Sequence, residues 1–299
     1  MPQFPSWLKK RVPRSKQTVR VRDLLQDCRL STVCREARCP NQGECFASGT
    51  ATFMILGDVC SRDCRFCAVQ HGPPAPPDPD EPQRLAEAVE RLDLDYAVVT
   101  SVTRDDLPDG GSCQFAEVVR RLHASSGADV EVLTPDFQGC RQNVGRVLDA
   151  GPRVFNHNVE TVPRLYPSVR PQAQYEQSLR VLALAAETDG ETMVKSGLMV
   201  GLGEREEELL GVFEDLLDAG CRMLTIGQYL QPSDENYPVE EFVRPEQFVR
   251  LKEKALRLGF DAVASGPFVR SSYRAREMAY RAEAGRSTER ISADSVSAK

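Results

Sequence analysis

Six of the ten cysteines in this 299-residue chain fall into two closely spaced groups of three. The first triplet has the spacing C-x4-C-x5-C and the second has C-x3-C-x2-C; they are Cys34, Cys39 and Cys45, then Cys60, Cys64 and Cys67. Three thiolates can hold a cubane iron–sulfur cluster and leave one iron without a cysteine, open to another ligand or to a substrate. The pattern therefore predicts two clusters with two different tasks.

Other uses of clustered cysteines fit this pattern less well. No segment reads as a secretory signal, so we expect reduced thiols rather than disulfides. Structural zinc sites usually pair C-x2-C knuckles into four ligands, and neither triplet contains two such knuckles. Cys28 precedes Cys34 by six positions and is close enough to add a fourth thiol. Spacing alone therefore leaves the ligand number at the first triplet open.

The second triplet lies in a recognisable local sequence. The segment from Val59 to Cys67, with Phe66 directly before the last cysteine, resembles the signature of radical S-adenosylmethionine (SAM) enzymes. The first triplet, the PSWLK sequence at Pro5–Lys9 and the RSSY sequence at Arg270–Tyr273 narrow the resemblance to the lipoyl synthase family. It covers roughly residues 5 to 280, which is nearly the whole chain.

The resemblance implies SAM and two [4Fe-4S] clusters as cofactors. The second triplet would hold the cluster that binds and cleaves SAM, which yields a 5′-deoxyadenosyl radical. Such a radical can remove hydrogen from an unactivated carbon, which is not acidic enough for a protein base near neutral pH. The first triplet would hold an auxiliary cluster that supplies sulfur. Cys34, Cys39 and Cys45 would then be catalytic residues as well as metal ligands.

The late RSSY sequence supplies one more candidate ligand. In the resembled family a serine of this sequence is the fourth ligand of the auxiliary cluster, which implies Ser272 here and Ser271 as the alternative. A hard alkoxide suits such a site less well than a thiolate, so we expect a serine-held iron to leave readily. Taken alone, the four-residue RSSY sequence is more typical of a polar turn or a helix start.

The candidate SAM contacts also come from the resemblance. They are Phe66, Asp109, Gly110, Gly111, Asn158, Glu160 and Gly201. The Asp-Gly-Gly sequence resembles an element that meets the methionine amino group, where glycine permits close backbone approach. Asn158 or Glu160 would hydrogen-bond the ribose, while Phe66 and Gly201 would lie near adenine. An ordinary turn, strand-end capping and tight glycine packing remain as alternatives.

The implied enzyme is a sulfurtransferase that inserts sulfur at C6 and C8 of an octanoyl chain on a lysine of a carrier domain. The implied carriers are the E2 component of 2-oxoacid dehydrogenases and the glycine cleavage H protein, and flavodoxin or ferredoxin would supply electrons in the cytoplasm. A methylthiotransferase or a biotin-synthase-like enzyme would share the chemistry of the second triplet. A zinc-binding adaptor without catalysis is the alternative from another class.

Composition limits the remaining classes. With 41% apolar and 27% charged residues, the chain is ordinary for a globular protein, and no apolar run is long enough to cross a membrane. A net charge of -6 argues against a general nucleic-acid binder. The exception is a basic arm before Asp23, which is either a locally packed tail or a docking surface for an acidic partner. It consists of Lys9, Lys10, Arg11, Arg14, Lys16, Arg20 and Arg22.

The arrangement of apolar segments predicts an α/β fold. Strand-like runs lie at residues 52–56, 96–102, 130–133, 153–156, 194–200, 224–229 and 262–264, with helical periodicity between them, as at Leu85, Val89 and Leu92. Two helices should end at Gly151 and Gly220. This alternation predicts parallel strands, and a partial (β/α)6 TIM-like barrel of the radical SAM type fits it best, with the site at the carboxyl ends of the strands.

Three segments fall outside the repeat. Residues 1–50 lack clear periodicity and are expected to form an extension that carries the first triplet over the barrel mouth. The barrel itself should occupy residues 51–283, with the late sequence also reaching the mouth. Six prolines from Pro73 to Pro82 predict a stiff, extended connector. Residues 284–299 are expected to be a polar, disordered tail.

Overall fold

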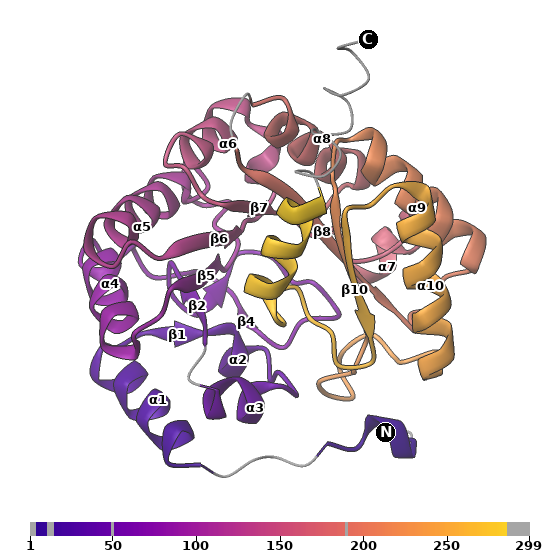
Figure 1. Ribbon diagram of the computed structural model, residues 1–299, viewed down its shortest axis with the longest axis horizontal. Coiled ribbons are helices and arrows are strands. Elements are labelled where there is room, and N and C mark those ends of the chain that lie inside the picture. The colour runs from indigo at the N-terminus through magenta and orange to yellow at the C-terminus, as the bar shows by residue number, and fades with distance from the viewer. Residues whose placement is uncertain (1–3, 11–14, 49–50, 189–190, 286–299) are drawn as a thin grey trace.

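A computed structural model describes residues 4–10, 15–48, 51–188 and 191–285. Its centre is an eight-stranded sheet in the order β1-β2-β5-β6-β7-β8-β9-β10 (Figure 1). All neighbours are parallel except β1 and β2. The strands are β1 (Ser31–Thr32), β2 (Thr52–Ile55), β5 (Tyr96–Ser101), β6 (Asp129–Leu133), β7 (Val154–Asn156), β8 (Met193–Val200), β9 (Met223–Gln228) and β10 (Ala262–Gly266). Within the described residues the two end strands do not pair, so the barrel is partial.

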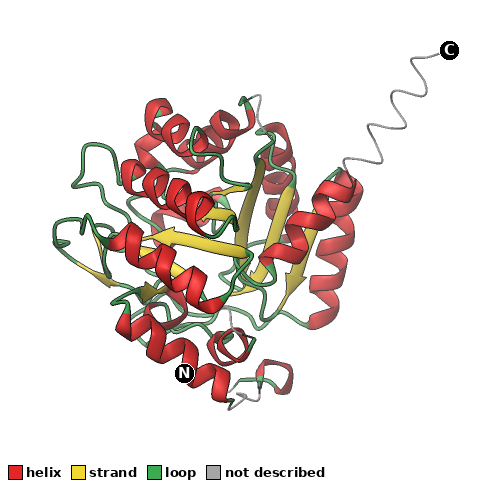
Figure 2. Cartoon of the chain, turned by 60° about the vertical axis from the view of Figure 1, so that its left-hand side comes forward, coloured by secondary structure: helices red, strands yellow, loops and turns green. Residues whose placement is uncertain are grey.

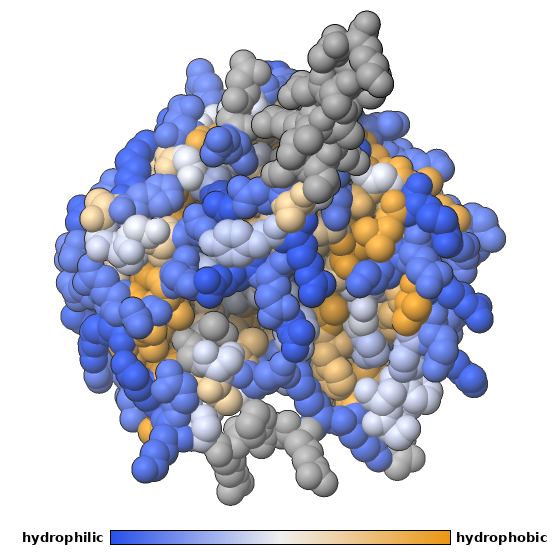
Figure 3. Space-filling view, in the orientation of Figure 1, coloured by the Kyte–Doolittle hydropathy of each residue, from blue (hydrophilic) through white to orange (hydrophobic). Residues whose placement is uncertain are grey.

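Helices surround the sheet, and their inward faces supply the core (Figures 1 and 2). They are α4 (Glu81–Leu92), α5 (Ser112–Ser125), α6 (Arg141–Leu148), the short α7 (Tyr166–Val169), α8 (Tyr175–Ala186), α9 (Glu206–Asp218) and α10 (Pro245–Leu258). Hydrophilic residues cover most of the outer face in Figure 3, with apolar residues visible between them. The predicted α/β alternation is confirmed.

Local sequence explains where these helices start and stop. The predicted stripe Leu85, Val89 and Leu92 is the buried face of α4. Pro82 does not belong to the extended connector: it lies in the first turn of α4, where a missing N–H costs no helical hydrogen bond. Gly151 and Gly220 follow α6 and α9 with φ of 77° and 78°, as expected for glycine after a helix end.

The N-terminal extension is more regular than its sequence indicates. It contains α1 (Lys16–Asp27), α2 (Val33–Glu36) and α3 (Gln42–Ala47). Ser15 caps α1 by accepting from the Thr18 N–H, and Leu24 and Leu25 lie on its buried face. The absence of periodic structure predicted for residues 1–50 is therefore wrong for α1. A narrow apolar stripe between charged residues hid the helix, which packs beside α3 and α4 (Figure 1).

The C-terminal segment has two roles. Residues 269–273 line the cavity at the carboxyl ends of the strands. Residues 275–285 are helical, and Met278 and Ala279 pack with Tyr96, Val154 and Met193, the first residues of their strands. This helix therefore covers the opposite end of the barrel. Its described part runs to residue 285, two residues beyond the predicted end of the barrel at 283. The rest of the predicted tail, 286–299, lies outside the described residues.

Short strands and 3-10 helices complete the description. The loop that carries the second triplet contains the paired β3 (Val59–Cys60) and β4 (Gln70–His71). Three-residue 3-10 helices occur at η1 (Ser6–Leu8), η2 (Phe137–Gly139) and η3 (Pro163–Leu165). In the part of the chain that the structure describes, every helix is too short or too polar to cross a bilayer.

Candidate active site

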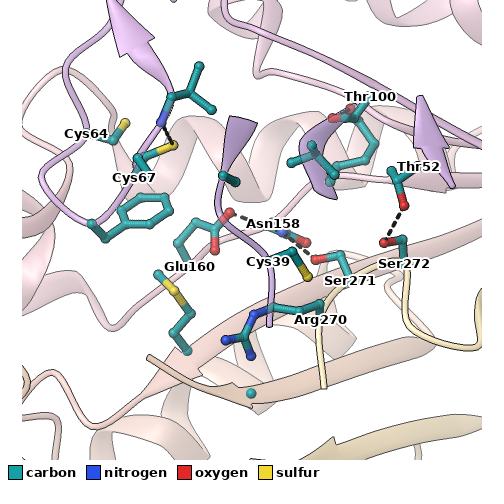
Figure 4. A pocket seen from close by; sticks show the side chains of 18 of the residues that line it. Cys39, Thr52, Cys64, Cys67, Thr100, Asn158, Glu160, Arg270, Ser271 and Ser272 are labelled. Carbon is teal, nitrogen blue, oxygen red and sulfur yellow. Dashed lines mark hydrogen bonds between the residues drawn. The ribbon is translucent and has the colours of Figure 1, made fainter. Parts of the chain in front are cut away.

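Both cysteine triplets open into one cavity of about 550 Å³ at the carboxyl ends of the strands. The RSSY sequence enters the same cavity, so residues that are far apart in the chain meet there (Figure 4). Phe66, Asn158 and Glu160 also line it. No three His, Cys, Asp or Glu side chains among the described residues converge on a single-ion site; each triplet instead presents its thiols to the shared space.

The second triplet lies on a loop that its own backbone and two carboxylates shape. The Arg62 N–H and the Thr103 N–H donate to Cys60 Sγ at 3.5 and 3.3 Å. The buried Arg62 guanidinium donates to Asp105 at 2.5 and 2.9 Å and to Asp136 at 2.7 and 2.8 Å. Amide donors to sulfur and a fixed loop are what a cluster-binding segment needs.

Burial makes the thiols of this triplet poor acids when no metal is bound. It raises the pKa of Cys67 to about 12, and it raises the pKa of Cys64 as well. A buried thiolate is unfavourable unless a cation replaces its proton. The site is therefore suited to an iron–sulfur cluster and ill suited to bare thiolates.

The first triplet is carried by the N-terminal extension, with Cys34 in α2 and Cys45 in α3. Burial raises the pKa of Cys34 to about 11 and that of Cys45 to about 12. Cys28 lies apart from this group: it is buried, accepts a hydrogen bond from Arg91 Nη1 at 3.6 Å, and does not line the cavity. The structure therefore leaves the first triplet with three thiols.

The extension and the late sequence are joined around the first triplet. Asn41 Nδ2 donates to the Phe268 carbonyl at 2.6 Å, and the Tyr273 hydroxyl donates to Glu44 Oε1 at 3.0 Å. Lys10 also pairs with Glu44 and donates to Asn41 Oδ1 at 2.8 Å. These contacts place the RSSY sequence beside the triplet.

The two adjacent serines have different partners (Figure 4). Ser272 Oγ accepts from Thr52 Oγ1 at 2.8 Å, whereas Ser271 Oγ accepts from Asn158 Nδ2 at 2.7 Å. Thr52 also hydrogen-bonds Cys34, which partly offsets the effect of burial on the pKa of that thiol. Ser272 thus belongs with the first triplet, and Ser271 with the candidate SAM contacts.

Two glycines make room for this segment. A Cβ added to Gly227 on β9 would lie 2.2 Å from the Val269 carbonyl oxygen. One added to Gly197 on β8 would lie 2.8 Å from Asn158 Oδ1 and 3.2 Å from Ser271 Oγ. Any side chain at these positions would push the late segment away from the strands.

The predicted ribose contacts lie in the cavity with unused hydrogen-bonding capacity. Asn158 Nδ2 donates to Glu160 Oε1 at 3.1 Å, while Asn158 Oδ1 finds no partner within the described residues. Burial raises the pKa of Glu160, although the charge of the nearby Arg170 opposes that rise. A buried polar atom without a partner indicates a position that a ligand can satisfy.

Four other predicted SAM contacts are not brought to the cavity; Asp109, Gly110, Gly111 and Gly201 are absent from its lining. Asp109 instead accepts from the N–H groups of Gly111 and Cys113 at 3.1 and 2.9 Å, at the start of α5. A Cβ on Gly111 would lie 2.2 Å from Leu56, and one on Gly201 would lie 2.2 Å from Gln228 Nε2. Helix capping and close packing explain these residues.

Sequence reasoning missed several residues of the site. Arg170 lines the cavity and donates to the Asn158 and Val159 carbonyls at 3.2 Å, but it stands in an irregular loop without a motif. Glu131 and Lys195 do not line the cavity, but Lys195 donates to the carbonyl of Ser271, which does; each is a charged residue inside an apolar strand, which is a signal in the sequence. They form a fully buried ion pair of 2.7 Å.

Comparison with known families matches residues 54–216 to the radical SAM superfamily and residues 1–39 to the N-terminal domain of lipoyl synthase of the radical SAM family. The lipoyl synthase of Caldanaerobacter subterraneus subsp. tengcongensis is 55% identical over 91% of this chain and 95% of its own length. That of Rubrobacter xylanophilus is 51% identical over 94% of this chain and 88% of its own length. The chain belongs to the lipoyl synthase family.

Membership of the lipoyl synthase family confirms the predicted enzyme class. The chain is a radical SAM sulfurtransferase whose cofactors are SAM and two [4Fe-4S] clusters. The cavity fits these groups, because its lining includes three thiols for each cluster. Ser101 Oγ and Asn158 Oδ1, from two further lining residues, have no hydrogen-bond partner among the described residues and could accept one from a ligand. Membership of this enzyme family excludes the alternative that the chain is a zinc-binding adaptor without catalysis.

Solved structures bear on the fold alone. Methylornithine synthase (PylB) is 14% identical, with a TM-score of 0.51 over 80% of this chain and 73% of its own. Streptococcus suis SuiB bound to S-adenosylmethionine is 9% identical, with a TM-score of 0.55 over 73% of this chain and 51% of its own. Together with the match of residues 54–216 to the radical SAM superfamily, these similarities confirm the predicted fold type.

Proposed function

We propose that this member of the lipoyl synthase family inserts two sulfur atoms, at C6 and C8, into an octanoyl chain on a lysine of a carrier domain, and that the sulfur comes from the auxiliary cluster. One observation carries the proposal: a single cavity contains two thiol triplets and a serine beside one of them. A substrate carbon in that cavity can face both a radical source and a sulfur source.

The residues divide between two cofactor sites. Cys60, Cys64 and Cys67 would hold the SAM-binding cluster, and Cys34, Cys39, Cys45 and Ser272 would hold the auxiliary cluster. When bound, these groups supply a carbon-centred radical generator and sulfide for insertion. Phe66, Asn158 and Glu160 would orient SAM, since they line the cavity. We assign Asp109, Gly110, Gly111 and Gly201 to support of the surrounding backbone rather than to SAM contact.

The walls between the two sites suit radical chemistry. Apolar side chains, including Leu198, Met199 and Leu230, line the cavity that the two triplets share. They would contact an acyl chain and exclude water, which limits side reactions of a reactive intermediate. No acidic or basic side chain of the protein is needed to remove hydrogen from the substrate.

The partners follow from the proposed substrate. We propose the E2 component of 2-oxoacid dehydrogenases and the glycine cleavage H protein as carriers, with flavodoxin or ferredoxin as reductant in the cytoplasm. Lys10 of the basic arm is locally packed on Asn41 and Glu44, and Arg20 donates to the Arg91 carbonyl. Lys9 and Lys16 are exposed and available for an acidic carrier, whereas the exposed Arg22 also pairs with Asp23 at 3.4 Å. Arg11 and Arg14 lie outside the described residues.

Anaerobic reconstitution with an octanoylated carrier peptide tests the reaction. We expect about eight irons per chain with matching acid-labile sulfide, since each cubane holds four. Mass spectrometry should detect the addition of two sulfurs and the loss of two hydrogens. Cys34→Ala and Ser272→Ala variants should still cleave SAM but fail to complete the product. A single cubane per chain, or a complete product from Cys34→Ala, would contradict the proposal.

A further inference from the structure

Neighbouring serines at the cavity wall face opposite halves of the site although they adjoin in the chain. Ser272 Oγ accepts from the Thr52 hydroxyl at 2.8 Å, and Ser271 Oγ accepts from Asn158 Nδ2 at 2.7 Å. The two hydroxyls therefore cannot exchange roles without breaking both hydrogen bonds. The structure itself distinguishes the two serines, which the sequence does not.

Thr52 is well placed to orient Ser272. It is the first residue of β2, is only 5% exposed, and lies against both Ser272 and Cys34. An iron-bound serine oxygen is an alkoxide and can only accept hydrogen bonds, so the Thr52 hydroxyl must be the donor. The Thr52 backbone N–H also donates to Cys34, and the Thr52 hydroxyl lies within hydrogen-bonding range of that sulfur as well as of Ser272.

A second contact holds the backbone between the serines. Lys195 Nζ donates to the Ser271 carbonyl at 2.6 Å and to Glu131 Oε1 at 2.7 Å. The Tyr96 hydroxyl donates to Glu131 Oε2 at 2.9 Å. Lys195 and Glu131 are fully buried, and a buried ion pair adds little net stability compared with apolar packing. Because Lys195 also donates to the Ser271 carbonyl, we infer that the ion pair orients the Ser271 backbone.

We propose that Thr52 and Lys195 are positioning residues that give the two serines different tasks: Thr52 directs Ser272 Oγ to the iron at the first triplet, and Lys195 fixes the intervening backbone. Ser271 is thereby kept on Asn158 and away from that iron. The inference rests on the proposed function, in which Ser272 ligates the auxiliary cluster.

The Thr52 part is tested in a full-length chain with Cys60, Cys64 and Cys67 changed to Ala, so that only the auxiliary cluster forms. Thr52→Val removes the hydroxyl at nearly constant volume, and Thr52→Ser restores it. Iron and sulfide content and the electron paramagnetic resonance signal of the three-iron form are measured after anaerobic reconstitution. We expect Thr52→Val to show several-fold more three-iron form than the parent, as Ser272→Ala does, and Thr52→Ser to match the parent.

The outcomes separate the inference from the proposed function. If Ser272→Ala loses iron but Thr52→Val retains four irons and the parental spectrum, positioning by Thr52 is overturned while serine ligation stands. If Ser272→Ala itself keeps four irons and the parental spectrum, both ideas fail. Circular dichroism and thermal melting of each variant confirm that all of them are folded.

The Lys195 part is tested without any cluster. The double variant Lys195→Met/Glu131→Gln removes the donor to Ser271 without leaving a buried charge, and the new amide oxygen can still accept from Tyr96. Hydrogen exchange of the Tyr273 amide, which donates to the Arg270 carbonyl at 2.9 Å, reports on the segment. We expect about tenfold faster exchange there than in the parent. Tyr96→Phe, which leaves the Lys195–Ser271 contact intact, is the control and should exchange as the parent does. Equal exchange in the double variant and the control would overturn this part.

Discussion

The two halves of the cavity are built in different ways. The second triplet spans eight consecutive residues on one loop, although distant residues also hold that loop: the Ser61 N–H donates to the Thr103 carbonyl at 3.0 Å, and the Tyr237 N–H donates to the Arg65 carbonyl at 2.8 Å. The first triplet depends on pairs separated by 220 to 229 positions, including Thr52–Ser272 and Glu44–Tyr273. The ligands of one half come from a single short loop, whereas those of the other include a serine from the opposite end of the chain.

This difference suits the proposed tasks. A catalyst that is reused benefits from a compact, rigid loop, and Arg62 supplies that rigidity through two carboxylates. A cluster that gives up sulfur must be rebuilt, and a site assembled from separate segments can open without unfolding the barrel. If the tasks are separate, damage to one half should leave the function of the other half intact.

The largest expected effect comes from Cys64→Ala. Loss of one thiolate from the second triplet should lower SAM cleavage by more than about 10³-fold, because the cluster is then incomplete. Cys45→Ala is the matched change in the other half, and it should leave SAM cleavage within about threefold of the parent. Chromatography of 5′-deoxyadenosine measures both. Equal loss in the two variants would show that the halves are not independent.

A smaller effect is expected when the Arg62 network is broken. Burial raises the pKa of Asp136, but the hydrogen bonds and charge of Arg62 outweigh it and lower that pKa well below its usual range. Arg62→Leu removes the cationic partner of the buried Asp136 and leaves it with the hydrogen bonds from Gln138 and Gln177, which should cost about 3–5 kcal/mol of unfolding free energy. Urea denaturation of the cluster-free chain measures this cost.

Removal of the stranded charge provides the control for Arg62. Adding Asp136→Asn to Arg62→Leu should recover part of the lost stability, since a neutral amide is easier to bury than an unpaired carboxylate. If the double variant is as unstable as Arg62→Leu, packing rather than charge accounts for the loss.

His157 makes the stability of the barrel sensitive to pH. Burial lowers its pKa to about 4, so the folded chain holds it neutral. The unfolded chain takes up a proton near pH 6.5, so the stability from this residue is present above that value and falls as the pH drops toward 4. Between pH 7 and 5 the cluster-free chain should lose about 2 kcal/mol more than His157→Asn. Identical pH profiles in urea denaturation would refute the assignment.

Asn41 tests the junction of the two chain ends. It is 1% exposed, donates to the Phe268 carbonyl and accepts from Lys10. Asn41→Ala should cost about 1–3 kcal/mol through the unsatisfied carbonyl, with faster hydrogen exchange near residues 268–273. Exchange at residues 59–72 should not change. A uniform increase over both regions would indicate one cooperative site instead of two halves.

The smallest effect concerns the basic arm. Changing Lys9, Lys16 and Arg22 to Ala should weaken affinity for an acidic carrier domain by about two- to fivefold at low salt, with little difference at high salt. Titration of affinity against ionic strength measures this. A salt-independent affinity in the parent chain would contradict docking through the arm.

Local sequence patterns predict the strands of the barrel better than they predict the half of the site around the first triplet. The strands at 96–102, 194–200 and 224–229 were predicted within one or two residues, because buried parallel strands are continuous apolar runs. Helix α1 is hard to recognise in the sequence, because its short apolar stripe lies among charged residues. Pro82 resembles the prolines of the connector before it, but proline also suits the first turn of a helix.

The positioning contacts were beyond reach of the sequence for a physical reason. Thr52 and Asn41 look ordinary in their own segments, and their partners lie more than 200 positions away. The glycines show a second limit: Gly111 and Gly201 are positions of close approach, as expected, but the sequence does not reveal that Leu56 and Gln228 are the protein groups beside them. A glycine indicates that another group can lie close to the backbone, but it does not indicate which group.

Isotopic labelling of the auxiliary cluster tests the central claim most directly. The chain is reconstituted with ³⁴S sulfide, freed of excess reagent, and given octanoylated carrier peptide, SAM and reductant with unlabelled sulfide in solution. The account predicts one product per chain with ³⁴S at both positions, together with loss of the cluster at the first triplet and retention of the other. Product sulfur that is unlabelled, or turnover that leaves both clusters intact, would contradict it.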